Sequence, residues 1–205
     1  MQSPLIVRSA DFSMRSDTAT NDGFTLSGYM AVFDQDTEIN SPFEGRFTER
    51  ISRGAFTKSI ARSKPVVQYD HGRDSRVGSI PIAEILELHE DAAGLFLEAR
   101  MFDNPTVEPI RQAIAAQAIS GASFKFRVTR DVWTNMKGRR LTPEQVDQAL
   151  AHGEHLRRSI KEVELAELGP VVFPAYKGTS IGVRTRTETI QPELLKMRLA
   201  LMNWK

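Results

Sequence analysis

The chain has 205 residues, of which 27 are basic and 26 acidic, so its formal net charge at pH 7 is +1. This length suits one domain with a sizeable core, and the near-neutral charge argues against a dedicated nucleic-acid-binding protein. The absence of cysteine excludes disulfides, thiolate metal sites and cysteine nucleophiles. No apolar run approaches the roughly 18–20 residues of a membrane span, and the N-terminus lacks a signal-peptide pattern, so we expect a soluble, intracellular protein.

The first third of the chain is predicted to consist mostly of short strands. Leu5–Val7 and Phe24–Phe33 have strand patterns, and a polar turn separates them. Residues 40–54 are rich in glycine, proline and charge, which predicts a loop. Apolar residues at helical spacing then predict a short helix at about 54–62, followed by a strand at 66–69.

Further strands and one clear helix follow before the middle of the chain. Val77–Ile82, Ala83–His89 and Gly94–Phe102 have strand patterns, and a turn of the sequence EDAAG joins the last two as a hairpin. Pro105–Ala118 is the clearest predicted helix, because its apolar residues form one stripe. The residues of this stripe are Val107, Ile110, Ile114 and Ala118.

A turn of small residues at 119–122 leads into an alternating strand, and Ser123 stands at the junction. Alternation places Ser123, Lys125 and Arg127 on one face of this strand. The opposite face carries Phe124, Phe126 and Val128, which predicts that it is anchored in the core. Ser123 can therefore be a nucleophile at the start of a strand, or an ordinary serine at a turn.

The last third of the chain contains a charged segment, another strand and a tail. Residues 131–158 are predicted to be a charged surface insertion, with a helix that Thr142 and Pro143 begin and that ends near His152. Ile160–Val172 has a strand pattern, and 185–205 is a basic amphipathic tail beyond a domain of residues 1–184. Many short strands with few helices predict an α+β, mostly β fold, either a barrel or a sandwich with helices outside.

A serine nucleophile needs a base, and the four histidines differ in setting. His71 directly follows an apolar strand, and Gly72 after it permits a sharp turn. His71 can be a catalytic base or a structural histidine. His89, His152 and His155 lie in charged segments and are expected at the surface.

A third group should orient the imidazole and stabilise its cation. In the strand at 160–168, alternation puts Glu167 on the same face as Val163 and Leu165. A carboxylate at an apolar position is costly unless it is paired, which makes Glu167 the preferred candidate. The alternative is that the strand ends before residue 167 and that Glu167 is solvated.

Two other kinds of site fit the sequence less well. The nucleophile elbow needs Gly-x-Ser-x-Gly between a strand and a helix, whereas Lys125 replaces the second glycine and a strand follows. His152 and His155 are the only closely spaced histidine pair, and they do not make a convincing metal site. We therefore expect no metal and no cofactor.

Six short motifs, in chain order, resemble the prohead (capsid maturation) proteases of HK97-like tailed phages, which are distant relatives in fold of the herpesvirus assemblins. Each motif is weak alone, but the order makes the set specific. Departures occur at Ala122, Lys125 and Leu168-Gly169, and none of them removes a candidate catalytic side chain. The motifs are GYMAVF at 28–33, ERISRGAF at 49–56, VQYDH at 67–71 with VG at 77–78, ED and GL at 90–95, ISGASF at 119–124 and ELGPVVFPA at 167–175.

This resemblance implies a fold and a function. The fold is an assemblin-like closed or partly open β-barrel with surrounding helices. The function is that of a serine endopeptidase with Ser123 as nucleophile and His71 as base, and Glu167 fits the third position. The implied partners are the major capsid protein and its scaffold segment, with self-association and self-cleavage also expected. The implied location is the host cytoplasm and then the interior of the prohead, with no membrane and no specific nucleic acid as partner.

Three further expectations concern a possible oxyanion loop and two rival functions. Gly138-Arg139-Arg140 is a weak candidate for an arginine-bearing oxyanion loop like that of the assemblins. A structural capsid or scaffold protein on a protease-like fold is one rival function. The other is an RNA-binding module, which would require Phe124 and Phe126 to be exposed for base stacking.

Overall fold

The computed structural model describes residues 4–11, 23–41 and 44–172. In this part of the chain strands predominate, and none of the helices is long and apolar enough to cross a membrane. The strands are β1 (Leu5–Asp11), β2 (Thr25–Val32), β3 (Thr37–Ser41), β4 (Gly45–Ile51), β5 (Val66–Val67), β6 (Ala83–Glu90), β7 (Gly94–Met101), β8 (Gly121–Asn135) and β9 (Leu156–Val171). The helices are α1 (Thr57–Arg62), α2 (Glu108–Ala115) and α3 (Pro143–Ala151), and η1 (Asp70–Gly72) is a short 3₁₀ turn.

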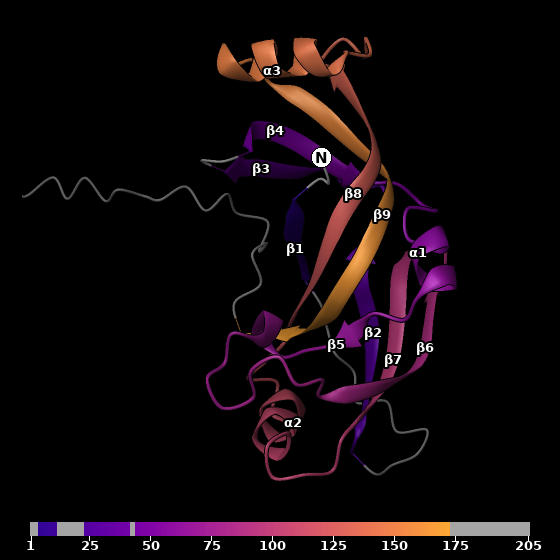
Figure 1. Cartoon of the computed structure of the whole chain (residues 1–205), viewed down its shortest axis with the longest axis vertical. Coiled ribbons are helices and arrows are strands. Elements are labelled where there is room, and N and C mark those ends of the chain that lie inside the picture. Colours follow the sequence, from indigo (N-terminus) through magenta and orange to yellow (C-terminus); the bar gives the residue numbers. More distant parts are fainter. Residues whose placement is uncertain (1–3, 12–22, 42–43, 173–205) are drawn as a thin grey trace, which may run out of the picture.

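All nine strands belong to one sheet, which the long β8–β9 hairpin crosses from end to end (Figure 1). The strand order is β1-β8-β9-β5-β6-β7-β2, and β4 also pairs with β9 while β3 pairs with β4. The pairings of β9 with β4 and with β5 are parallel, and the other pairings are antiparallel. The expected mostly β fold is confirmed. The sheet is not a closed barrel, because within the described residues β1 and β2 end the order without pairing to each other.

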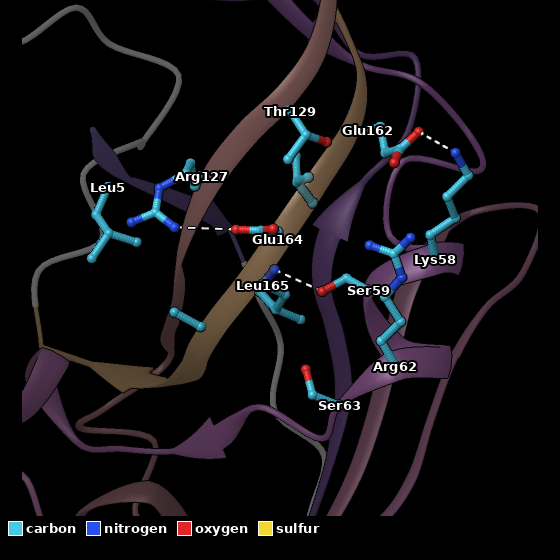
Figure 2. A pocket seen from close by; sticks show the side chains of 12 residues that line it. Leu5, Lys58, Ser59, Arg62, Ser63, Arg127, Thr129, Glu162, Glu164 and Leu165 are labelled. Carbon is cyan, nitrogen blue, oxygen red and sulfur yellow. Dashed lines mark hydrogen bonds and ion pairs between the residues drawn. The ribbon is translucent and has the colours of Figure 1, made fainter. Parts of the chain in front are cut away.

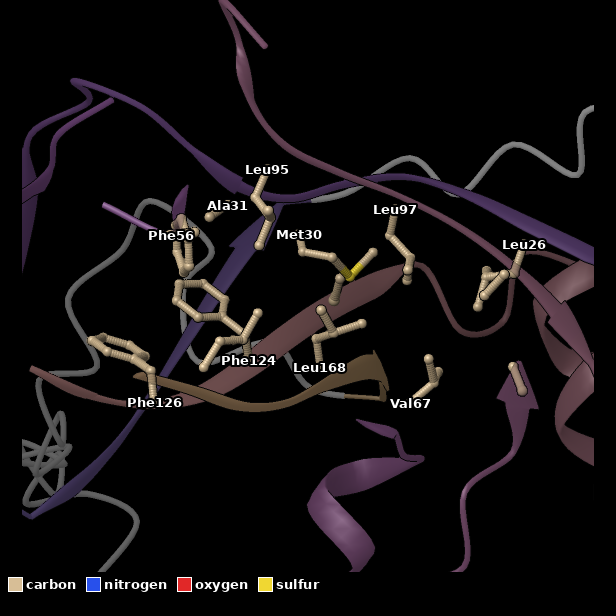
Figure 3. Packing of buried hydrophobic residues seen from close by; sticks show 14 of the residues in the cluster. Leu26, Met30, Ala31, Phe56, Val67, Leu95, Leu97, Phe124, Phe126 and Leu168 are labelled. Atoms are coloured by element: carbon tan, nitrogen blue, oxygen red, sulfur yellow. The ribbon is translucent and has the colours of Figure 1, made fainter. Parts of the chain in front are cut away.

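The alternation predicted for the central strand β8 is confirmed. Phe124 and Phe126 are 1% and 0% exposed, and their rings lie 5.1 Å apart in a stacked arrangement. Phe124 also meets the ring of Phe56 edge-on at 5.7 Å, and Figure 3 shows these rings beside Met30. Burial of both phenylalanines contradicts the RNA-binding hypothesis, which needs them on the surface.

A second, smaller core lies at the far end of the β8–β9 hairpin. Thr142 caps α3, with its hydroxyl accepting a hydrogen bond from Gln145 N–H and the Gln145 side chain bonding back to Thr142 N–H. The predicted start of this helix is therefore confirmed. The cluster under α3 consists of Ile39, Phe47, Val146, Ala149 and Leu156, with Trp133, Leu141 and Leu150 packed against it.

The loop predicted at residues 40–54 is wrong, because this region contains most of the β3–β4 hairpin. Ile39 pairs with Phe47 across the two strands, and both side chains are buried. Charged residues had suggested a loop, but Glu49 is buried and paired with Arg8 at 2.5 Å. A charge that has a buried partner is compatible with an interior strand.

Two other predicted boundaries differ from the structure. Residues 77–82 form turns rather than a strand, because the Asp74 carboxylate accepts the N–H groups of Arg76 and Val77 at 2.9 and 3.1 Å. The helix predicted at 105–118 is confirmed but ends at Ala115, since Gln117 has a left-handed φ of 58°. Residues 173–205, which include the predicted tail, lie outside the described residues.

Replacing Phe124 with alanine should lower the free energy of unfolding by about 3–5 kcal/mol, because it leaves a cavity between two packed rings. Phe102, which is 41% exposed, is the matched control, and its alanine variant should lose no more than about 1.5 kcal/mol. Urea denaturation measures both values. Equal losses for the two variants would contradict the central position of Phe124.

Candidate active site

His71 lies in a left-handed turn directly after β5. Asp70, His71 and Gly72 have φ values of 45°, 58° and 73°. This region is unfavourable for residues other than glycine, and such conformations are concentrated at functional sites. The turn brings η1 against both β8 and β9, and the His71 side chain is only 4% exposed.

A buried carboxylate orients the His71 ring. Nδ1 of His71 makes a short hydrogen bond with Oε1 of Glu167, and the Glu167 side chain is 5% exposed. The other carboxylate oxygen, Oε2, is buried and has no hydrogen-bond partner among the described residues. Because Nδ1 is occupied by Glu167, Nε2 is the ring nitrogen left to accept and return a proton.

A β-bulge places Glu167 on the face where it meets His71. Lys125 pairs with Glu167 and Phe126 pairs with Leu165, so Ala166 is an extra residue in β9. A one-residue shift moves a side chain to the other face of a strand. Alternation had placed Glu167 beside Leu165, and this is wrong, although the choice of Glu167 as a paired buried carboxylate agrees with the structure.

Ser123 lies two residues before Lys125 on β8, and Lys125 is the residue that pairs with Glu167. Ser123 pairs with Gly169, two residues beyond Glu167, and diagonal neighbours of this kind have Cα atoms about 7–8 Å apart. Ser123 is fully buried, and its hydroxyl donates a hydrogen bond to the Arg8 carbonyl at 2.8 Å. The structure therefore joins His71 to Glu167 and places Ser123 on the strand that pairs with the strand of Glu167.

Gly169 allows the chain segment before His71 to lie against β9. A Cβ atom at this position would come within 2.0 Å of the Gln68 carbonyl oxygen. The Gln68 N–H also donates to the Leu168 carbonyl at 3.0 Å. The segment before His71 thus packs against β9 at a position where only glycine leaves room. This glycine, Gly169, pairs with Ser123.

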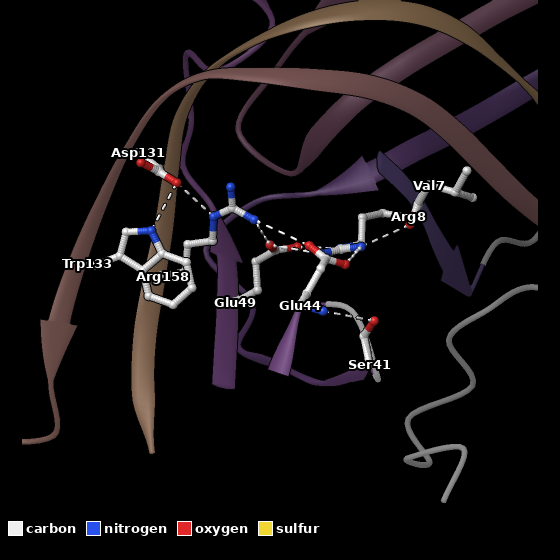
Figure 4. A network of polar contacts seen from close by, with 8 residues as sticks. All are labelled: Val7, Arg8, Ser41, Glu44, Glu49, Asp131, Trp133 and Arg158. Carbon is white, nitrogen blue, oxygen red and sulfur yellow. Dashed lines mark hydrogen bonds and ion pairs between the residues drawn. The ribbon is translucent and has the colours of Figure 1, made fainter. Parts of the chain in front are cut away.

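Arg8 anchors β1, the strand whose backbone contacts Ser123. Its guanidinium binds Glu49 at 2.5 and 3.1 Å and Glu44 at 3.1 and 3.2 Å. Arg158 joins this network through Glu49 at 3.2 Å and Asp131 at 2.8 Å (Figure 4). Sequence reasoning missed Arg8, although a charged residue two positions after the apolar Ile6, and so on the same face of a strand, was a usable signal.

The remaining candidates lie elsewhere. His89 is 43% exposed beside Glu87, and His155 contacts Thr48 at 2.8 Å near the β3–β4 hairpin. His152 is exposed, and the described residues include no cluster that could hold a metal ion. Gly138–Arg140 follows the far end of β8, whose 15 residues begin at Gly121, so this segment does not reach Ser123.

A histidine that a buried carboxylate orients, together with a serine on the paired strand, fits a serine hydrolase. The family model described as caudovirus prohead serine protease matches residues 10–192 of the chain. The chain therefore belongs to the caudovirus prohead serine protease family, which confirms the resemblance seen in the sequence motifs. It is a serine protease of phage capsid maturation.

One solved structure with a similar fold comes from bacteriophage T4 and is described as its capsid assembly protease, gp21. The TM-score is 0.50 at 10% sequence identity, and the match covers 85% of this chain and 100% of the other. At this identity the match supports the fold alone. No curated protein sequence matches the chain.

Replacing Gly169 with alanine should lower the free energy of unfolding by more than about 2 kcal/mol, because the new Cβ overlaps the Gln68 backbone. Gly138, which has a left-handed φ of 81° but open space around it, is the control. Its alanine variant should lose about 1 kcal/mol from the backbone conformation alone. If urea denaturation gives Gly169→Ala the smaller loss, the close approach is not a real constraint.

Replacing Arg8 with methionine should lower the free energy of unfolding by about 3 kcal/mol, because Glu44 and Glu49 lose their shared cation while Glu49 stays buried. Arg46 is 73% exposed and lies 3.9 Å from Glu38, so Arg46→Met should lose less than about 1 kcal/mol. Thermal or urea unfolding of both variants provides the comparison. A mild effect at Arg8 would mean that the network contributes little to anchoring β1.

Proposed function

We propose that Ser123, His71 and Glu167 are the catalytic triad of this prohead protease. The observation that carries the proposal is the buried His71–Glu167 hydrogen bond beside the buried hydroxyl of Ser123. Three different segments of the chain converge here, and two of them use unusual backbone features, the left-handed His71 and the bulge at Ala166. A purely structural role would explain neither feature.

In the proposed mechanism, Nε2 of His71 takes the proton of Ser123 as the hydroxyl attacks the carbonyl carbon of a peptide bond. The imidazolium then gives this proton to the leaving amine, and an acyl-enzyme remains on Ser123. Water attacks the acyl-enzyme with His71 again acting as base, which releases the second product and restores the serine. Glu167 keeps Nδ1 occupied and stabilises the imidazolium throughout.

Before attack, the Ser123 hydroxyl must turn away from its present acceptor. It donates to the Arg8 carbonyl at 2.8 Å and is fully buried. A hydrogen bond to a backbone carbonyl holds the proton in a direction that does not serve catalysis. We therefore assign this arrangement to a resting enzyme, in which rotation of one side chain redirects the proton to His71.

The proposed substrates are the major capsid protein and its scaffold segment, cleaved inside the prohead after assembly in the host cytoplasm. Membership of the caudovirus prohead serine protease family supports this choice. Self-association and self-cleavage, the latter near residues 180–190, belong to the same proposal. The mechanism uses amino-acid side chains alone and needs no cofactor.

Co-expression with the cognate capsid protein tests the triad. Ser123→Ala and His71→Ala should abolish detectable capsid cleavage, because each removes a group that forms or breaks a bond. Glu167→Gln should lower the cleavage rate by at least about 100-fold, because an amide can neither stabilise the imidazolium nor impose the same tautomer. Gel electrophoresis and mass spectrometry of the capsid subunit give the rates.

Ser120→Ala is the matched control for these variants, since Ser120 is an exposed serine three residues before Ser123. It should cleave like the wild type. Intact mass of each protease shows self-cleavage, which should also require Ser123. Cleavage of the capsid subunit by Ser123→Ala at the wild-type rate would refute the proposed nucleophile.

A further inference from the structure

Lys125 lies on the same face of β8 as Ser123, and the proposed triad does not use it. It follows Ser123 by two residues and pairs directly with Glu167 across β8 and β9. Within the described part of the chain, its ammonium makes no hydrogen bond or ion pair, although the residue is half-buried. Glu167 directs its hydrogen bond to His71 instead. An unpaired, half-buried cation beside a nucleophile is available to a ligand.

A groove of about 280 Å³ lies farther along β8 and β9 (Figure 2). Its lining on β9 includes Ala166, the residue immediately before Glu167, and on β8 it includes Arg127. The opposite wall is α1, which the Leu165 N–H joins to β9 through the Ser59 hydroxyl at 2.8 Å. On β9 the groove therefore ends at the residue before Glu167, and its α1 wall is hydrogen-bonded to that strand.

The charges along the groove favour an acidic occupant. Arg127 and Lys58 are already paired, with Glu164 at 3.1 Å and Glu162 at 2.7 Å. Arg62 lines the same groove and interacts electrostatically with Glu162. Both carboxylates of the lining are thus neutralised within the groove, whereas Lys125 near Ser123 has no partner among the described residues.

We infer that this face binds the substrate peptide and that Lys125 receives an acidic side chain close to the scissile bond. The inference rests on the proposed function of Ser123. Two residues of a strand span about 6.6 Å, which is also the advance of two residues in an extended peptide. The acidic residue is therefore within two positions of the bond that Ser123 attacks. Lys125 acts as a residue that determines specificity and takes no part in proton transfer.

Charge reversal on both partners tests the inference in the full-length enzyme. Cleavage sites in the co-expressed capsid protein are mapped by mass spectrometry, and a Glu or Asp should lie within two residues of each cut. Replacing that acidic residue with lysine should slow cleavage by the wild-type enzyme about tenfold or more, because like charges then meet at Lys125. Lys125→Glu should reverse the preference, cutting the lysine-bearing substrate faster than the native one.

Lys137→Glu is the matched control, since it makes the same charge change at an exposed turn beyond the far end of β8 and should keep the wild-type preference. Lys125→Met keeps the length of the side chain without its charge, and it serves if Lys125→Glu does not fold. It should cut both substrates at similar rates.

Different results would contradict the role of Lys125 and the proposed function of Ser123. Absence of acidic residues near the mapped cuts would overturn the role of Lys125, while cleavage that depends on Ser123 would leave the triad intact. An unchanged preference in the Lys125 variants would have the same meaning. If the wild type and Ser123→Ala both leave the capsid protein uncut, the proposed function fails, and this inference fails with it.

Discussion

The antiparallel pairing of β8 with β9 is the constraint on which the candidate active site depends. It places Ser123 opposite Gly169 and Lys125 opposite Glu167, so one strand pair positions both the proposed nucleophile and the carboxylate that orients His71. The same β9 also pairs in parallel with β5, from which the chain turns directly into His71. The buried rings of Phe124 and Phe126 hold the other face of β8 in the core. A shift of this register by one residue would turn the serine away from the histidine.

The candidate active site depends on three local irregularities of the backbone: a β-bulge, a left-handed turn and a close approach at a glycine. The bulge at Ala166 turns Glu167 toward the site, and the left-handed turn at His71 returns the imidazole over the strands. Gly169 leaves room for the Gln68 backbone, which a Cβ at this position would overlap. Each irregularity has an unfavourable local energy, so the surrounding pairing and packing must hold it in place.

The sequence predicted those parts of the molecule that depend on periodicity and local turns. The alternation after Gly121, the hairpin at 90–95 and the cap at Thr142 were all visible, because each is encoded within a few residues. The β3–β4 strands were missed because their charge is satisfied by Arg8, a partner 41 residues distant from Glu49. Glu167 is buried and paired as predicted, while its face was wrong, since a bulge leaves no signal in a simple alternation.

The contacts of Ser123 and His71 join residues that are far apart in the sequence, which bears on the order in which the chain folds. The Ser123 hydroxyl meets the carbonyl of Arg8 from a strand 115 positions earlier, and His71 meets Glu167 across 96 positions. Contacts this distant in sequence form late, because the loops between them must first be closed. A growing polypeptide on the ribosome has no oriented imidazole until residue 167 has emerged. Incomplete chains therefore contain Ser123 and His71 without Glu167, the carboxylate that orients the imidazole.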